Sequence, residues 1–211
     1  MPTVLAHDVV ERANDVLNDV LSARWGDDTL LNYLNEAQYA VVAARPDANA
    51  VNATMGCLPS AKQVLPAGGL RLIEVMSNTD TGKPVTLIDV DLLNEQVPEW
   101  RKVDPPVRAI DHYVYDDRDP KTFYVYPTPE QGHQIDLVYA AVPERVAGLG
   151  DTITVDDIYF NPLVDHMLWR AFSRDTANPA GASQASIHWQ AFATALGLKV
   201  KADAAMSPNN G

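Results

Sequence analysis

The five histidines are the residues best suited to hold a transition metal, and their spacing does not favour a site. They lie at His7, His112, His133, His166 and His188, and the sequence contains no His-Glu-x-x-His or Cys-x-x-Cys pattern. His166 and His188 can meet across the last pair of predicted helices, although a helix-surface or hydrogen-bonded core histidine is a far more common arrangement. We therefore expect no metal and no other cofactor.

Nucleophilic and acid–base chemistry finds equally little support. Cys57 lies in a predicted strand, where a buried and unreactive thiol is expected. No G-x-S-x-G or phosphate-binding glycine pattern occurs, and Gly68-Gly69 is typical of a turn. The acidic run Asp116–Asp119 lacks the ligand order of a calcium loop, so it is predicted to be a solvated hairpin turn. We expect no catalytic residues and no enzyme, with a hydrolase that lacks a known motif as an alternative, because any two carboxylates can meet in a fold.

The charge of the chain argues against a nucleic-acid-binding surface. Sixteen Lys and Arg residues stand against 28 Asp and Glu residues, which gives a formal charge of −12. Binding to DNA depends on basic side chains that displace counterions. The nearest approach to a basic patch, at Arg101, Lys102 and Arg108, lies among prolines. The acidity either serves solubility or lets a surface lie close to DNA without binding it.

The N-terminal segment and the cysteine content bear on location. Residues 1–15 hold acidic residues from the eighth position on and no unbroken apolar run, so no signal peptide is predicted. No segment approaches the roughly 18 apolar residues that cross a bilayer, and no membrane association is expected. Because Cys57 is the only cysteine, no intrachain disulfide can form. These features predict a protein that folds in a reducing cytosol.

Two helices are predicted in residues 1–50. The first covers about Asp8–Ser22, because apolar residues recur there every three or four positions and form one stripe. An acidic pair at Asp27 opens the second helix. That helix must end near Arg45, because a proline follows and disfavours a helical residue before it. The short connection predicts an antiparallel pair.

The chain changes character over residues 51–155, where prolines, turn residues and short aromatic or β-branched runs predominate. Such runs between turn residues are typical of strands. One short helix is expected at Asp89–Trp100. The predicted strands are Thr54–Leu58, Gln63–Leu65, Leu70–Ser77, Val85–Ile88, His112–Tyr115, Phe123–Tyr126 and Gln134–Ala141.

The clearest pairing signal is a hairpin over His112–Pro127. Tyr113–Tyr115 forms one arm and Phe123–Tyr126 the other, and such side chains pair well across antiparallel strands. A further turn leads to the strand Gln134–Ala141. Together these segments predict an antiparallel meander.

Helices return near the end of the chain. Asn161 followed by Pro162 is a good cap and first helical position for a helix that ends at about Thr176. A last helix is predicted at about Ala182–Leu196, with Gly197 as its C-terminal cap. The polar residues after it are expected to be disordered in the isolated chain.

These elements predict an α+β fold. Helix pairs in residues 1–50 and 156–198 form a helical bundle, and residues 51–155 form a β-rich antiparallel insertion between them. Residues 199–211 form an extended tail.

Several segments together resemble the head-to-tail adaptor proteins of tailed bacteriophages. The run Trp25–Gln38 is similar to the opening helices of that family, and Arg45–Ala48 ends the helix in the same manner. The hairpin Asp119–Pro127, the run Leu163–Asp175 and the closing Met206–Asn209 are similar as well. Their order along nearly the whole chain is that of the family, with tail tubular protein A-like adaptors as the nearest likeness.

The resemblance implies a structural virion protein of the capsid–tail junction, the virion neck, that assembles in the cytoplasm of a bacterial host. Family members form a ring, usually a dodecamer, between the portal at the capsid vertex and the tail. Their helical part lies against the portal, their C-terminal segment extends into it, and their β-rich part faces tail or nozzle proteins. The genomic DNA passes through the lumen without sequence-specific binding.

Two sets of interface residues are expected from this likeness. A disordered tail that orders on its partner is a common means of docking. The expected portal-binding residues are Asp203, Met206, Ser207, Pro208 and Asn209. Aromatic strand residues suit contacts with neighbouring subunits or tail proteins. The expected residues of that contact are Tyr113, Tyr115, Tyr124 and Tyr126. Another neck or tail-completion protein of a phage is the nearest alternative.

Overall fold

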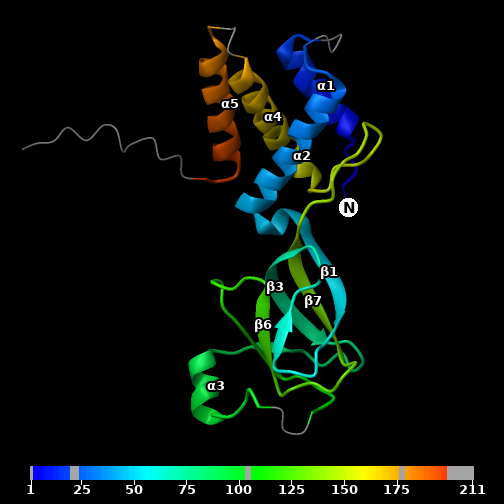
Figure 1. The fold of residues 1–211 in the computed structure, drawn as a ribbon, viewed down its shortest axis with the longest axis vertical. Helices are drawn as coiled ribbons and strands as arrows, with labels where there is room; N and C mark the ends of the chain where they lie inside the picture. Colours follow the sequence, from blue (N-terminus) through cyan, green and yellow to red (C-terminus); the bar gives the residue numbers. More distant parts are fainter. Residues whose placement is uncertain (1, 20–23, 103–105, 176–178, 199–211) are drawn as a thin grey trace, which may run out of the picture. The chain divides into compact units, whose positions relative to one another are not determined.

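The chain forms two compact units in the computed structural model (Figure 1). The described residues are 2–19, 24–102, 106–175 and 179–198. Both ends of the chain contribute to one unit, called here the helical unit, which takes in residues up to Ala48 and from Pro143 on. The other unit, called the strand unit, is Asn49–Val142. The predicted α+β architecture, with helices towards both ends and a β-rich middle, is confirmed.

The helical unit is built around one central helix. Its helices are α1 (Ala6–Leu17), α2 (Asp27–Ala44), η2 (Asp157–Tyr159), α4 (Phe160–Arg174) and α5 (Gly181–Ala195), and the short η1 (Pro46–Asn49) follows α2. Helix α4 packs against α1, α2 and α5. Figure 1 shows α1 and α5 on opposite sides of the pair α2 and α4. Apolar stripes of these helices meet in a core whose largest fully buried side chains include Leu30, Leu34, Leu163, Met167 and Phe192.

The first helix begins earlier and ends sooner than the predicted Asp8–Ser22. Asp8 lies in the first turn, where its carboxylate accepts a hydrogen bond from the Leu5 N–H at 3.2 Å. The helix ends at Leu17 because Asn18 adopts the left-handed conformation, with φ 58°, and returns its N–H to carbonyls of the preceding turn. Apolar periodicity continues past this point in the sequence, so it overstated the length of the helix.

The start of α4 also differs from its prediction. Asn161 and Pro162 were expected to be its cap and first position, but they lie inside the helix. Asp156 caps the preceding η2 instead, since its carboxylate accepts a hydrogen bond from the Ile158 N–H at 3.1 Å, and η2 leads directly into α4. The predicted cap at Gly197 is confirmed, because that residue follows α5 with a φ of 69°.

The strand unit contains two sheets. One sheet has the order β1 (Ala50–Gly56), β7 (Gln134–Ala141), β3 (Gly69–Asn78). The other has the order β2 (Lys62–Val64), β6 (Thr122–Tyr126), β5 (His112–Tyr115), β4 (Thr86–Leu87). Every predicted strand is present, with ends shifted by a few residues.

The predicted hairpin is confirmed, but the predicted meander is wrong. Strands β5 and β6 pair antiparallel with Tyr113 opposite Val125. Strand β7 joins the other sheet, where it pairs with β1 along one edge and β3 along the other. This central place buries its apolar Ile135, Leu137 and Tyr139 and satisfies the backbone of two long strands. Strand β4 pairs parallel with β5, so the unit is not wholly antiparallel.

Two apolar clusters fill the strand unit. The larger cluster lies between the sheets and includes Leu72, Val75 and Phe123, all nearly or fully buried. The smaller cluster includes Leu93 of the short helix α3 (Val90–Gln96) together with Trp100. Helix α3 is shorter than the predicted Asp89–Trp100, because a proline two residues after its end cannot continue it.

The segment 143–155, which the sequence pattern assigned to the β-rich insertion, belongs to the compact helical unit. Two buried amides of α2 hold it. Asn35 donates from Nδ2 to the Val146 carbonyl at 3.0 Å, and its Oδ1 accepts from the Val146 N–H at 2.8 Å. The Gln38 Oε1 accepts from the Thr154 N–H at 2.6 Å. Side-chain bonds of this kind leave no periodic signal in a sequence.

Candidate interaction surfaces

The four expected interface tyrosines lie on the β5–β6 hairpin, but on opposite faces of it. Tyr113 and Tyr115 share a face with Phe123 and pack against the larger apolar cluster. Tyr124 and Tyr126 lie on the other face, against the smaller cluster. The two faces follow from the alternation of side chains along a strand.

The exposure of these tyrosines differs accordingly. Tyr113 is only 6% exposed, and burial raises the pKa of its hydroxyl. Tyr115 is partly buried and donates from its hydroxyl to the Pro120 carbonyl at 3.2 Å. Tyr124 and Tyr126 are also partly buried. The surface that a partner can reach on this hairpin therefore comes from Tyr115, Tyr124 and Tyr126.

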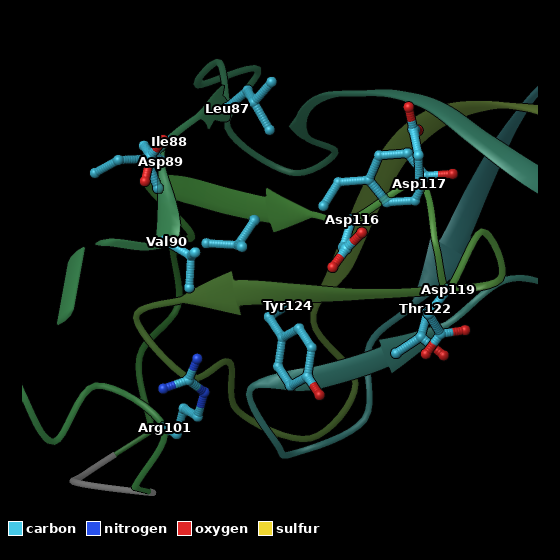
Figure 2. A pocket seen from close by; sticks show the side chains of 12 residues that line it. Leu87, Ile88, Asp89, Val90, Arg101, Asp116, Asp117, Asp119, Thr122 and Tyr124 are labelled. Atoms are coloured by element: carbon cyan, nitrogen blue, oxygen red, sulfur yellow. The ribbon is translucent and has the colours of Figure 1, made fainter. Parts of the chain in front are cut away.

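An open pocket of about 640 Å³ lies beside the hairpin, and Tyr115 and Tyr124 both line it. Figure 2 shows the three aspartates of the hairpin turn on one side of the pocket and Arg101 on another. Residues 87–90, from β4 to the start of α3, complete much of the wall. The pocket is thus lined by acidic, aromatic and apolar side chains of the strand unit.

The acidic turn is organised by ion pairs at the surface. Asp116 pairs with Arg118, whose Nη2 lies 2.6 Å from its Oδ2, and hydrogen bonds from Arg118 lower the pKa of Asp116 to about 2. Asp117 pairs with Arg71 across 2.9 Å. The predicted solvated hairpin turn is confirmed. A carboxylate that stays ionised at every physiological pH suits a fixed charge and not a proton donor.

Arg101 is held in a fixed position at the pocket wall. Its guanidinium lies 4.2 Å from the ring centre of Trp100 and 5.9 Å from that of Tyr124. The Asn94 Oδ1 accepts from both Trp100 Nε1, at 2.9 Å, and Arg101 Nη1, at 3.1 Å. Aromatic faces and a shared amide oxygen therefore hold this cation at the pocket wall.

A second hollow, of about 510 Å³, lies in the helical unit between α2, α4 and the 143–155 segment. We call it the arginine groove, because Arg145, Arg170 and Arg174 line it together with a single acid, Glu36. Tyr33 contributes an aromatic wall, since the Arg170 guanidinium lies 5.9 Å from its ring centre. The groove therefore carries an excess of positive charge in an acidic chain.

The two histidines expected near the last helix pair do lie there, with separate partners. His166 of α4 is 4% exposed and packs edge-on against Trp169 and Phe192, each with ring centres 5.0 Å away. Burial, with a smaller contribution from a nearby arginine, lowers the pKa of His166 to about 4. His188 of α5 lies 2.9 Å from the Asp165 carboxylate. Each ring is thus a packing element of the α4–α5 contact.

Two further polar groups of the strand unit are buried. The Asn78 side chain donates to the carbonyls of Lys83 and Ile110 at 2.9 Å, and its Oδ1 accepts from the Ile110 N–H at 2.8 Å. His133 Nε2 lies 2.8 Å from the same oxygen. Cys57 is buried as predicted, and burial raises the pKa of its thiol to about 12.

Sequence reasoning found the hairpin and the acidic turn but missed the groove. Arg145 comes from a loop, whereas Arg170 and Arg174 come from α4, so the sequence contains no local run of basic residues that would indicate the groove. A weak signal exists in α4, where Arg170 and Arg174 are four residues apart and must share a face of the helix.

The described part of the chain holds neither a cluster of metal-ligand residues nor a helix suited to span a membrane. No group of three or more His, Cys, Asp or Glu residues at 2–19, 24–102, 106–175 and 179–198 is placed to hold a metal ion. Within the same residues, no helix is both long and apolar enough to span a bilayer. The expected portal-binding residues Asp203, Met206, Ser207, Pro208 and Asn209 lie outside the described residues.

Comparison with known proteins points to a family. The family model described as SU10 adaptor protein matches residues 6–211, which is nearly the whole chain. No curated protein matches the sequence.

Proposed function

This chain belongs to the SU10 adaptor protein family, and on that premise we propose that it is a subunit of a ring that joins the portal to the tail in the neck of a tailed bacteriophage. The observation that carries the proposal is the extent of the match, which runs from α1 to the last residue and covers both compact units. A structural adaptor acts through its surfaces and not through bond chemistry. A role like that of tail tubular protein A is part of this proposal.

The two units suit different partners. In the proposed ring the helical unit lies against the portal, and the strand unit, with its partly exposed Tyr115, Tyr124 and Tyr126, meets tail or nozzle proteins. Partly buried aromatic side chains beside charged residues are typical of protein interfaces. The pocket at the hairpin, which Arg101 and three aspartates of the turn help to line, adds polar groups that can orient such a partner.

The acidity of the chain suits the passage of DNA through the ring. Because each chain carries a formal charge of −12, a ring of such chains as a whole repels a phosphate backbone. The cations near the hairpin are largely paired with acids, as Arg108 is with Glu130 at 3.1 Å and Lys102 is with Glu99. A genome can therefore move through the lumen without being held by sequence-specific or strong non-specific binding.

The C-terminal residues are the proposed portal-docking element. An extended segment with few charges can order on a partner, and twelve copies in a ring multiply a modest affinity. Deletion of Asp203–Gly211 is expected to abolish binding to the portal in a pull-down while leaving the helical content of the chain unchanged. A matched control replaces the same residues with a Gly-Ser segment of equal length. Full portal binding by the deletion variant would reject the docking role of this segment.

A further inference from the structure

The arginine groove has a chemistry that calls for an anionic partner. Its three arginines face one acid, Glu36, so the groove carries an excess of two positive charges. The Arg170 Nε lies 2.7 Å from a Glu36 carboxylate oxygen, yet its N–H finds no acceptor with hydrogen-bond geometry among the described residues. Arg174 makes a long contact, 3.5 Å, with the Tyr33 hydroxyl, and Arg145 donates from Nη2 to the Asn32 Oδ1 at 2.5 Å. Donors of this kind are stronger when they bind carboxylates.

The surroundings of the groove resemble the centre of a protein interface. Tyr39 lines it and is 43% exposed. The Arg170 guanidinium also lies 5.5 Å from the ring centre of Trp169, whose ring packs at a tilt against that of Trp189, which is 37% exposed. Tyrosine, tryptophan and arginine are the residue types that carry most of the binding energy in protein interfaces.

An acidic surface lies on α1 of the same unit. Asp8, Glu11 and Asp15 are spaced by three and four residues, so they form one ridge along α1, called here the acidic ridge. All three are exposed, and the buried residues of α1, which include Val9 and Ala13, face the other way, into the core. His7 lies beside the ridge, 3.6 Å from Asp8, and Arg12 flanks it. No lysine or arginine of the described chain pairs with Glu11 or Asp15.

The ridge and the groove are separate surfaces built from different helices. The groove residues Asn32 and Glu36 lie on the face of α2 opposite to Leu30 and Leu34, which are buried in the core. The ridge lies on α1, which packs against α2 and α4. One unit therefore presents two different surfaces of opposite charge, which is what head-to-tail association of identical copies needs.

We propose that the arginine groove of one copy binds the acidic ridge of α1 of a second copy, and that this contact joins neighbours in the ring. The inference rests on the proposed function, which requires a ring, and adds the surfaces that close it. A second copy fits better than another acidic protein, because every copy carries both complementary surfaces. Local attraction is also needed, since copies with a net charge of −12 repel one another as a whole.

Charge reversal on either surface tests the contact. Arg145→Glu with Arg174→Glu reverses the groove, and it spares Arg170, which is packed between rings. Glu11→Arg with Asp15→Arg reverses the ridge, and it spares Asp8, which caps α1. Each pair is expected to raise the dissociation constant of self-association by roughly 100-fold, measured by sedimentation velocity at low salt. The matched control, Arg108→Glu with Arg118→Glu, makes the same charge change as the groove reversal at exposed sites of the strand unit and should associate like the wild type.

Mixing the two variants gives a sharper test. A groove-reversed copy presents two acidic surfaces and a ridge-reversed copy presents two basic ones, so neither should associate alone. An equimolar mixture should restore rings in which the two variants alternate, which native mass spectrometry detects by mass. A mixture that stays monomeric overturns the proposal.

The outcomes separate this inference from the proposed function. If the wild type forms rings and each charge-reversed variant forms them equally well alone, in solution or on the portal, the groove–ridge contact is rejected and the adaptor role stays intact. A wild-type chain that stays monomeric up to about 1 mM, and also fails to assemble on the portal, overturns both.

Discussion

The helical unit and the strand unit each use a buried asparagine to hold another segment of the chain, but the two units draw these segments from different distances along the sequence. In the helical unit, Asn35 fastens the segment around Val146 to a helix that lies more than a hundred residues away in the sequence. In the strand unit, Asn78 fastens Ile110 and receives His133, all within one continuous stretch of chain. One unit is thus completed only by both ends of the chain, whereas the other is complete in itself. This contrast predicts that the two units can be perturbed separately.

Core truncations should show the largest separate effects. Phe123 in the strand unit and Met167 in the helical unit are both fully buried. Phe123→Ala is expected to destabilise the strand unit by about 3–5 kcal/mol and Met167→Ala the helical unit by about 2–5 kcal/mol, through lost packing and the cavity left behind. Hydrogen exchange followed by mass spectrometry should locate each loss in its own unit. Equal loss of protection in both units, for either variant, would show that they unfold together.

Acid should destabilise the helical unit through His166. Burial holds the pKa of this histidine at about 4 in the folded state, whereas the unfolded chain takes up the proton near pH 6.5. The stabilisation is therefore complete above pH 6.5 and is lost as the pH falls towards 4, by on the order of 3 kcal/mol. Urea unfolding at a series of pH values measures the loss. His166→Gln, which cannot take up the proton, should flatten the curve in this window, and an unchanged slope would assign the effect to other groups.

The buried side chains of Asn78 and Asn35, called here the asparagine clamps, offer a matched pair of substitutions with smaller expected effects. Asn78→Ala and Asn35→Ala each leave buried backbone groups without partners, at a cost of about 1–3 kcal/mol. Asn78→Ala should increase hydrogen exchange around Ile110, and Asn35→Ala should do so around Val146. If Asn35→Ala left the amide of Val146 as protected as in the wild type, the clamp would not be what holds that segment.

The smallest expected effect is on the rate at which Cys57 reacts with a thiol reagent, and not on the free energy of unfolding. Burial raises the pKa of the Cys57 thiol to about 12, so the folded strand unit should react only slowly with a thiol reagent at pH 8. The labelling rate should rise with Phe123→Ala and stay unchanged with Met167→Ala, because only the first loosens the unit that contains Cys57. Fast labelling of the native wild type would contradict the burial of this residue.

Much of the fold follows from local patterns. The apolar spacing of α2 and α5, and the aromatic arms of β5 and β6, sufficed to place these elements near their observed bounds. Termini were less predictable, because Asn18 ends α1 by adopting a left-handed backbone that apolar periodicity does not report. The pairing of β7 with β1 and β3 was not predicted. A strand can pair with any long strand whose edge is free, and the local sequence pattern does not report which strand that is.

The candidate surfaces were harder to predict than the fold. Four tyrosines in one hairpin indicated an interface, but strand alternation sends Tyr113 into the core while Tyr124 lies on the opposite face. The arginine groove required knowledge that Arg145 lies beside α4, which is a tertiary fact set by the Asn35 clamp. Recognition of the family depended on the order of many moderately specific segments and on no single motif.

The proposed function makes this chain a structural piece of a phage neck. Electron microscopy of whole virions, with an antibody fragment bound to the strand unit of this chain, shows whether the chain is there. We expect a ring of labelled copies between the capsid vertex and the tail, into whose density both units fit. Virions with complete necks that carry no label there, and no copy of the chain by mass spectrometry, would contradict the account.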